Sequence, residues 1–169
     1  QLRELLTGYG PVFEVFLEPT CPFSAKAFSK LDDTLHSAGA HNVTLKIWLH
    51  SQPWHLFSGV ITRCALAAST LAEGKGATKK VLAGVAAHRD KFEPADHCSG
   101  PLLVLSPADI IARVEEYSGL KLGEAYALPK LDQEVKRHTK YARQNGIHVS
   151  PTFMIDGLVQ NDMSSGDAV

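Results

Sequence analysis

Apolar and polar positions divide this chain into two ends that contain strands and a middle that contains helices. Residues 22–37 carry apolar side chains at helical spacing, between two short apolar runs. A strand, a helix and a strand in this order form a βαβ unit, whose strands are expected to be parallel. The predicted strands lie at residues 12–17, 43–49, 152–155 and 158–159, with Asp156-Gly157 as the turn before the last one.

The middle of the chain predicts helices only. Apolar residues recur at helical spacing from His55 to about Leu128, and four prolines separate the segments. A further helix is expected before Gly146, because acidic residues lie early in that stretch and basic residues late. The predicted fold class is therefore α/β, with residues 1–55 and 129–169 in one domain and residues 56–128 as an all-helical insertion. Only residues 160–169 follow the last strand, so the final helix that would pack on the sheet after it is expected to be no more than started.

The composition excludes several functional classes. A chain of 169 residues with 44% hydrophobic residues can bury a sizeable core. A net charge of -1 argues against binding to nucleic acids or membrane surfaces. No apolar run approaches the roughly 18 residues that span a bilayer, and no signal peptide is visible. The chain begins at Gln1, which indicates that upstream residues were removed, and a soluble protein of the bacterial cytoplasm or periplasm is the expectation.

Cys21 is the leading candidate for chemistry, because it lies where the first strand passes into the first helix. The first-turn amides of a helix lack intrahelical partners, and the helix dipole places positive charge there, so the thiolate is favoured. Pro22 suits the first helical position. The thiol is thus expected at the exposed end of an anchored helix. The alternative is that Cys21 is a small buried apolar residue.

The other cysteines predict neither a disulfide scaffold nor a metal site. Three cysteines are too few for such a scaffold, and the odd count leaves at least one unpaired within the chain. Cys64 lies on an apolar helical face and is expected to be buried, whereas Cys98 is expected to be exposed and could pair with Cys64 or Cys21. His88, His97 and Cys98 match no structural zinc spacing.

Two stretches together resemble the thioredoxin superfamily, and within it the DsbA-like branch of disulfide oxidoreductases and isomerases. Residues 17–24, Leu-Glu-Pro-Thr-Cys-Pro-Phe-Ser, resemble its strand end and C-P-x-C motif, and residues 149–153, Val-Ser-Pro-Thr-Phe, resemble its cis-proline loop. Residues 52–55, Gln-Pro-Trp-His, are also similar. The resemblance is best over residues 11–57 and 130–160, and it implies a thioredoxin-like fold.

The same resemblance implies a substrate groove. It implies that Ser150-Pro151 is cis and faces the sulfur of Cys21. The sequence departs from the family at Ser24, which occupies the place of the second, resolving cysteine. The residues expected to contact substrate are Pro22, Phe23, Trp54, Ser150 and Pro151.

A single thiol beside a hydroxyl predicts monothiol exchange. The Cys21 thiolate can attack a substrate disulfide, and Ser24 can hydrogen-bond that thiolate but cannot resolve the adduct. The expected activity is that of a protein-disulfide isomerase or a mixed-disulfide reductase, acting on protein or small-molecule disulfides. Glutathione is a candidate co-substrate, and no bound cofactor is expected. Glu18 could accept a proton, or be an ordinary surface carboxylate.

Two alternatives remain open. Kappa-class glutathione transferases and 2-hydroxychromene-2-carboxylate isomerases share the helical insertion, but their motif resembles S-P-x-S, whereas Cys21 in the first position favours redox chemistry. The other alternative is a non-catalytic thioredoxin-like module that binds peptides in the cis-proline groove.

Overall fold

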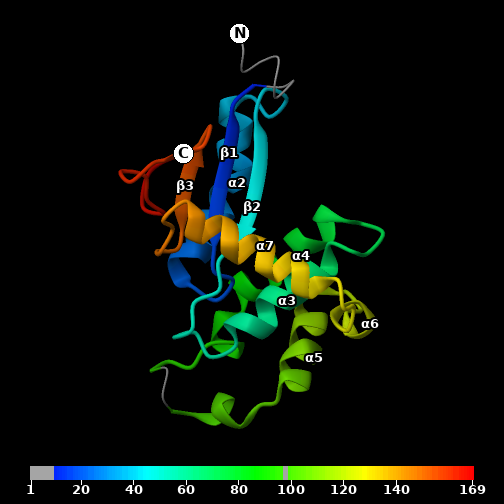
Figure 1. Ribbon diagram of the computed structural model, residues 1–169. Coiled ribbons are helices and arrows are strands. Elements are labelled where there is room, and N and C mark those ends of the chain that lie inside the picture. The colour runs from blue at the N-terminus through cyan, green and yellow to red at the C-terminus, as the bar shows by residue number, and fades with distance from the viewer. Residues whose placement is uncertain (1–9, 97–98) are drawn as a thin grey trace.

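A four-stranded sheet with helices on both faces organises the computed structural model, which describes residues 10–96 and 99–169 (Figure 1). The strand order is β2-β1-β3-β4. The central strand pairs in parallel with β2 and antiparallel with β3, which confirms the predicted parallel βαβ unit. The strands are β1 (Val12–Leu17), β2 (Thr44–Leu49), β3 (Thr152–Ile155) and β4 (Leu158–Val159), so the second strand begins one residue later than predicted.

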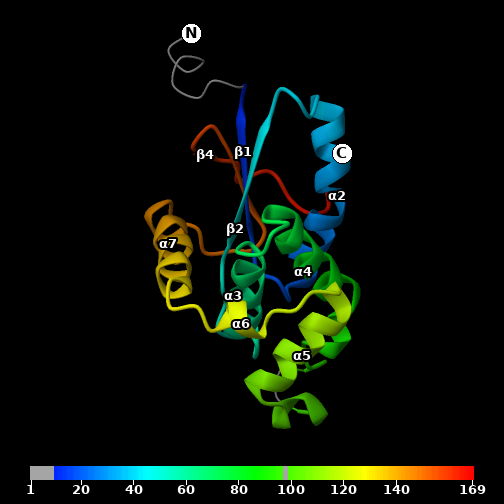
Figure 2. The same ribbon diagram turned by 90° about the vertical axis from the view of Figure 1, so that its right-hand side faces the viewer.

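The central strand is buried on both faces because its alternate side chains enter two different clusters. Phe13, Val15 and Leu17 pack against α2 (Pro22–Ala38). Phe16 points to the other face and packs with Ala142 of α7 (Leu131–Gln144). Figure 2 shows the sheet nearly edge-on, with α7 on one side and α2 on the other. This packing on both faces fixes the end of β1, from which the chain passes to Cys21.

Local sequence sets both ends of α2. Cys21 is the N-cap residue in an extended conformation, and Pro22 takes the first helical position, where its missing N–H costs no hydrogen bond. Gly39 ends the helix in the left-handed conformation at φ 81°, which glycine adopts without a steric penalty. The buried face of the helix includes Ala27 and Leu31.

Helices fill the chain between β2 and α7, as the apolar spacing predicted (Figure 1). They share one core, in which Ile61, Val81 and Ile110 are fully buried. The division into a domain and an insertion at residues 56–128 stays a prediction. The elements are α3 (Ser58–Ala68), α4 (Lys75–Ala87), η1 (Arg89–Lys91), η2 (Pro101–Val104), α5 (Pro107–Ser118) and α6 (Gly123–Tyr126).

The last ten residues form turns and contain no helix, in agreement with the expectation that a final helix is no more than started. The Lys30 ammonium of α2 donates to the carbonyls of Ser165 and Asp167, which holds this segment against α2. No helix within residues 10–96 and 99–169 is both long and apolar enough to cross a membrane.

Candidate active site

Cys21 lies at the start of α2, as predicted, but it is not exposed there. Only 5% of the residue is accessible, and its thiol donates a hydrogen bond to the Ser150 carbonyl at 3.5 Å. The expectation of an exposed thiol is therefore wrong. The reason is that Ser150, which lies 129 positions away in the sequence, contacts the thiol, and a pattern within residues 12–37 carries no information about that distant loop. The side chain still borders a cavity.

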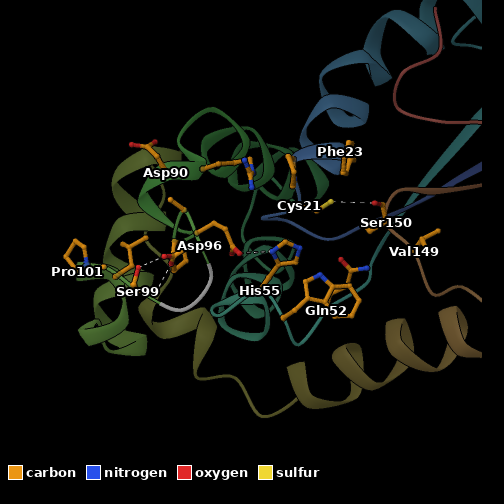
Figure 3. A pocket seen from close by; sticks show the side chains of 18 of the residues that line it. Cys21, Phe23, Gln52, His55, Asp90, Asp96, Ser99, Pro101, Val149 and Ser150 are labelled. Carbon is orange, nitrogen blue, oxygen red and sulfur yellow. Dashed lines mark hydrogen bonds and ion pairs between the residues drawn. The ribbon is translucent and has the colours of Figure 1, made fainter.

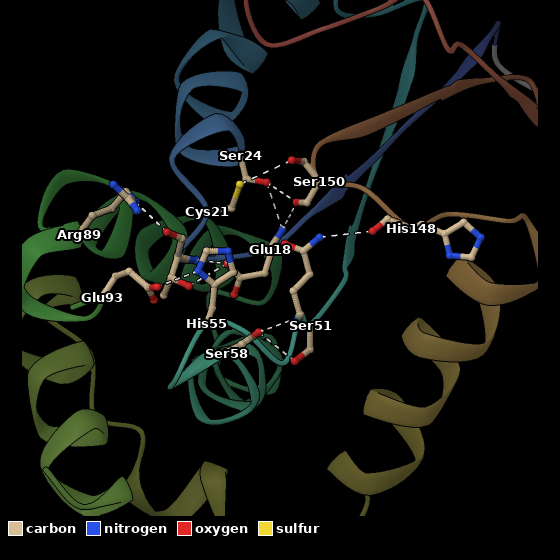
Figure 4. Close-up of polar contacts among 12 residues, drawn as sticks. Glu18, Cys21, Ser24, Ser51, His55, Ser58, Arg89, Glu93, His148 and Ser150 are labelled. Atoms are coloured by element: carbon tan, nitrogen blue, oxygen red, sulfur yellow. Dashed lines mark hydrogen bonds and ion pairs between the residues drawn. The ribbon is translucent and has the colours of Figure 1, made fainter. Parts of the chain in front are cut away.

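The loop that covers Cys21 contains the expected cis peptide. The Ser150-Pro151 bond is cis, and the Ser150 carbonyl faces the sulfur. The Ser150 hydroxyl accepts a hydrogen bond from the Glu18 N–H at 2.7 Å. One residue of this loop therefore contacts both the strand end and the helix start, as Figure 4 shows.

The Ser24 side chain hydrogen-bonds to the cis-proline loop. Its buried hydroxyl accepts from the Glu18 N–H at 3.2 Å and shares a hydrogen bond with the Ser150 hydroxyl. Among the described residues no hydrogen bond joins Ser24 to the Cys21 thiol, and a bond from Ser24 to the thiolate stays a prediction. The hydroxyls of Ser24 and Ser150 both lie next to the Glu18 N–H, and this places them close enough to hydrogen-bond to each other.

Glu18 is fully buried, so the alternative of a surface carboxylate is wrong. Its Oε2 atom accepts hydrogen bonds from the Thr20 N–H at 2.8 Å and the Thr20 hydroxyl at 2.7 Å. His55 Nε2 lies 3.7 Å from the same oxygen. Burial raises the pKa of Glu18 above 4.5, and the Thr20 bonds and the charge on His55 oppose this rise.

The raised pKa of Glu18 predicts how stability depends on pH. Between 4.5 and the folded-state pKa, the folded protein keeps a proton that the unfolded chain releases, so stability falls as the pH rises through this window. Glu18→Gln removes this effect, and its amide oxygen can still accept the Thr20 bonds. We expect a Tm at about pH 7 that is higher by about 2 °C or more, the shift produced by ~1 kcal/mol in a chain of this size.

Thermal unfolding of both proteins at about pH 7 and about pH 4.5 tests this expectation. The difference in Tm between Glu18→Gln and the parent should become smaller toward the lower pH, because there the Glu18 carboxyl is increasingly protonated in the unfolded chain as well. A Tm for Glu18→Gln below that of the parent at about pH 7 would show that the ionised carboxylate stabilises the fold.

Three residues of the site were not predicted as site residues. His55 Nδ1 lies 3.0 Å from Glu93 Oε1, and both side chains are almost completely buried. Arg89 donates from Nε to the Thr20 carbonyl at 2.7 Å. His55 is the last residue of the Gln-Pro-Trp-His stretch at residues 52–55, whereas Arg89 and Glu93 lie in the predicted helical stretch, which resembles no motif. An acidic residue between the buried residues Phe92 and Pro94 is the signal that could have indicated Glu93.

A cavity of about 860 Å³ separates the helix start from the segment that follows α4 (Figure 3). This volume is within the usual range for sites that bind small molecules. Cys21, His55 and Glu93 line it. The predicted contact residues Pro22, Phe23, Trp54 and Ser150 also line it. Phe23 and Trp54 are 62% and 57% exposed, so their apolar surface is available to a partner.

The remaining candidates lie away from this cavity or outside the described residues. Cys64 is fully enclosed in the helical core, and burial raises the pKa of its thiol to about 12. His88 stacks on Tyr117 in the helical region. His97 and Cys98 lie outside the described residues. Within residues 10–96 and 99–169, no group of three or more His, Cys, Asp or Glu side chains could hold a metal ion.

The sheet, the helix that begins at Cys21 and the cis peptide facing its sulfur are those of a thioredoxin-like protein with a helical insertion. A protein of Pseudomonas syringae, provisionally described as a protein-disulfide isomerase, is 64% identical, with a TM-score of 0.92 over 95% of this chain and 91% of that chain. The chain therefore belongs to the DsbA-like family of thioredoxin-fold disulfide oxidoreductases, and thiol-disulfide exchange is its activity.

More distant structures share the fold. A thioredoxin-like oxidoreductase of Silicibacter pomeroyi is 18% identical, with a TM-score of 0.62 over 89% of this chain and 77% of its own. DsbA of Xylella fastidiosa is also 18% identical, with a TM-score of 0.61 over 89% of this chain and 75% of its own. No family model and no curated protein matches the sequence.

Proposed function

We propose that the protein exchanges disulfides through one thiol, that of Cys21, as a protein-disulfide isomerase or a mixed-disulfide reductase. The observation that carries this proposal is that two residues at the start of α2 hydrogen-bond to the cis-proline loop. Both Cys21 and Ser24 contact Ser150, and only the first of them can form a disulfide. Of the two cysteines that the structure describes, the other is Cys64, which is enclosed in the core.

Each exchange then proceeds in two balanced steps. The Cys21 thiolate attacks one sulfur of the substrate disulfide, so that a bond forms to Cys21, the substrate S–S bond breaks and the second sulfur leaves as a thiolate that takes up a proton. A second thiolate then attacks the mixed disulfide and releases Cys21. This second thiolate is the substrate's own in an isomerisation, and it comes from a small thiol such as glutathione in a reduction.

Glu18 is the proton acceptor and donor of this cycle. Its carboxyl group is buried three residues before the reactive cysteine, and the Cys21 N–H donates to its backbone carbonyl at 3.2 Å. Because burial raises the pKa of Glu18, the group can hold a proton closer to neutral pH than an exposed carboxyl can. The first-turn amides of α2 stabilise the thiolate that remains.

Substrate binds across the loop that faces the sulfur. The Ser150-Pro151 segment, Pro22, Phe23 and Trp54 form the contact surface. Phe23 and Trp54 carry exposed rings, which contribute buried apolar area when a chain covers them. The cavity beside them suits the size of a tripeptide thiol such as glutathione.

Incubation with oxidised glutathione tests the monothiol mechanism. We expect one glutathione adduct, located on Cys21 by mass spectrometry of peptides, which persists until a thiol is added. The adduct persists because Ser24 cannot expel it. Disappearance of the adduct without added thiol, combined with persistence in Cys98→Ser, would identify an internal resolving thiol and overturn the mechanism. Conjugation of an electrophile to glutathione without any adduct on the protein would instead indicate a transferase.

A further inference from the structure

Arg89 places a fixed positive charge in the wall of the cavity that contains the reactive cysteine. It is the first residue of η1, and the described residues that line the cavity include no other arginine and no lysine. Its Nε donates to the Thr20 carbonyl at 2.7 Å (Figure 4). That carbonyl belongs to the peptide group that joins Thr20 to Cys21, so the guanidinium is held against the backbone of the nucleophile.

This hydrogen bond orients the guanidinium and leaves its two terminal nitrogens for a ligand. The acceptor is fixed, because Thr20 is fully buried at the end of β1. Arg89 itself is half-buried, and in the part of the chain that the structure describes neither Nη1 nor Nη2 makes a hydrogen bond or an ion pair. Two neighbouring N–H groups of an arginine fit the two oxygens of a carboxylate. The cavity therefore presents an oriented binding group for a carboxylate close to Cys21.

The acidic side chains of the cavity do not occupy this binding group. Asp90, Glu93 and Asp96 also line the cavity, yet no ion pair joins any of them to Arg89. Each has a partner elsewhere: the Lys91 ammonium at 3.4 Å for Asp90, His55 Nδ1 at 3.0 Å for Glu93, and the N–H and hydroxyl of Ser99 for Asp96. A carboxylate that reaches the terminal nitrogens of Arg89 thus comes from outside the cavity wall.

We propose that Arg89 binds the carboxylate of the substrate disulfide, and that the preferred substrate carries this group about one residue from its reacting sulfur. Oxidised glutathione does so, because its glycine follows the cysteine directly. Neighbouring Cα atoms are about 3.8 Å apart, so this carboxylate stays close to the Thr20-Cys21 peptide group when the sulfur meets Cys21. The proposal rests on the proposed function, since it names the substrate that Cys21 attacks.

Arg89 positions the disulfide and takes no part in the exchange of bonds. The Cys21 sulfur forms a bond to one glutathione, the glutathione S–S bond breaks, and the other glutathione leaves as a thiolate that takes up a proton. Binding of the glycine carboxylate restricts the orientation of the disulfide before this attack, which raises the rate for a substrate that carries the carboxylate over one that lacks it.

Two disulfides compared on the same protein test this role. Oxidised glutathione carries the carboxylate, bis(2-hydroxyethyl) disulfide carries no charge, and mass spectrometry follows how fast each forms an adduct on Cys21. In Arg89→Gln we expect the rate with oxidised glutathione to fall about tenfold or more, as loss of a hydrogen-bonded charge pair implies. The rate with the neutral disulfide should stay close to that of the parent. A partly misfolded variant would lower both rates, so their ratio isolates recognition of the carboxylate.

Two further variants and an esterified substrate serve as controls. Arg89→Lys keeps the charge but lacks the planar pair of N–H groups, so it should retain only part of the preference. Arg137→Gln removes the same charge from α7, where Arg137 pairs with Glu134, and should leave the ratio of rates unchanged. Oxidised glutathione esterified at both glycine carboxylates should react slowly with the parent and no more slowly with Arg89→Gln, because both changes remove one contact.

An equal fall of both rates in Arg89→Gln would show that Arg89 acts on the thiol and not on the substrate, and it would overturn the proposal. A parental ratio of rates in Arg89→Gln, or a parental rate with the esterified disulfide, would overturn it as well. The proposed function survives each of these results, because Cys21 still forms adducts. It fails, and this proposal with it, if neither disulfide forms an adduct with the parent.

Discussion

Replacement of Cys21 by alanine is expected to abolish thiol-disulfide exchange. The chemistry requires a sulfur nucleophile at the cavity, and Cys64 cannot supply one because it is enclosed in the helical core with a pKa raised to about 12. The glutathione adduct should be absent from the mass spectrum of Cys21→Ala, and the rate of isomerisation of a protein with scrambled disulfides should fall to that of the buffer alone.

Cys64→Ala is the control for this variant. It removes a sulfur from the core, so it should lower the free energy of unfolding while the adduct still forms on Cys21. An adduct on the Cys21→Ala protein would show that another cysteine is the nucleophile, and the proposed function would then fail. Normal peptide binding by Cys21→Ala, together with a parent that exchanges nothing, would favour a non-catalytic peptide-binding module.

Most of the fold was predictable because its signals are local. The run from Val12 to Leu17, the start of a helix at Pro22 and the turn at Asp156-Gly157 each depend on neighbouring residues only. One strand boundary differs from the prediction, and by one residue, since Val43 can extend the pattern of the second strand without pairing in the sheet. The parallel pairing followed from the βαβ order, which leaves the chain few alternatives.

The interior of the site was less predictable because it depends on contacts between distant residues. The sequence indicated Cys21 through its place between the first strand and the first helix, and the family resemblance implied that the cis-proline loop faces its sulfur, but neither indicated that the thiol is almost completely buried. Glu93 has no local motif, and its importance follows only from its contact with His55. Burial likewise excludes the surface-carboxylate alternative that the sequence left open for Glu18, and it raises the pKa of this group.

Ser24→Cys is expected to convert the protein from a monothiol exchanger into one with an internal dithiol pair. Side chains at 21 and 24 lie one helical turn apart and both contact Ser150, so the two sulfurs would face the same loop within reach of a disulfide. The Glu18 N–H keeps its shorter bond to the Ser150 hydroxyl, so loss of the Ser24 hydroxyl should be tolerated.

After oxidised glutathione is added, the parent should keep its adduct, whereas Ser24→Cys should release the glutathione and lose the mass of two hydrogen atoms, because the new thiolate attacks the Cys21 sulfur. Ser24→Ala is the matched control, since it removes the hydroxyl without adding a thiol and should keep the adduct as the parent does. Persistence of the adduct in Ser24→Cys would mean that the two side chains cannot approach each other, and the helix start would then not have the geometry of a dithiol site.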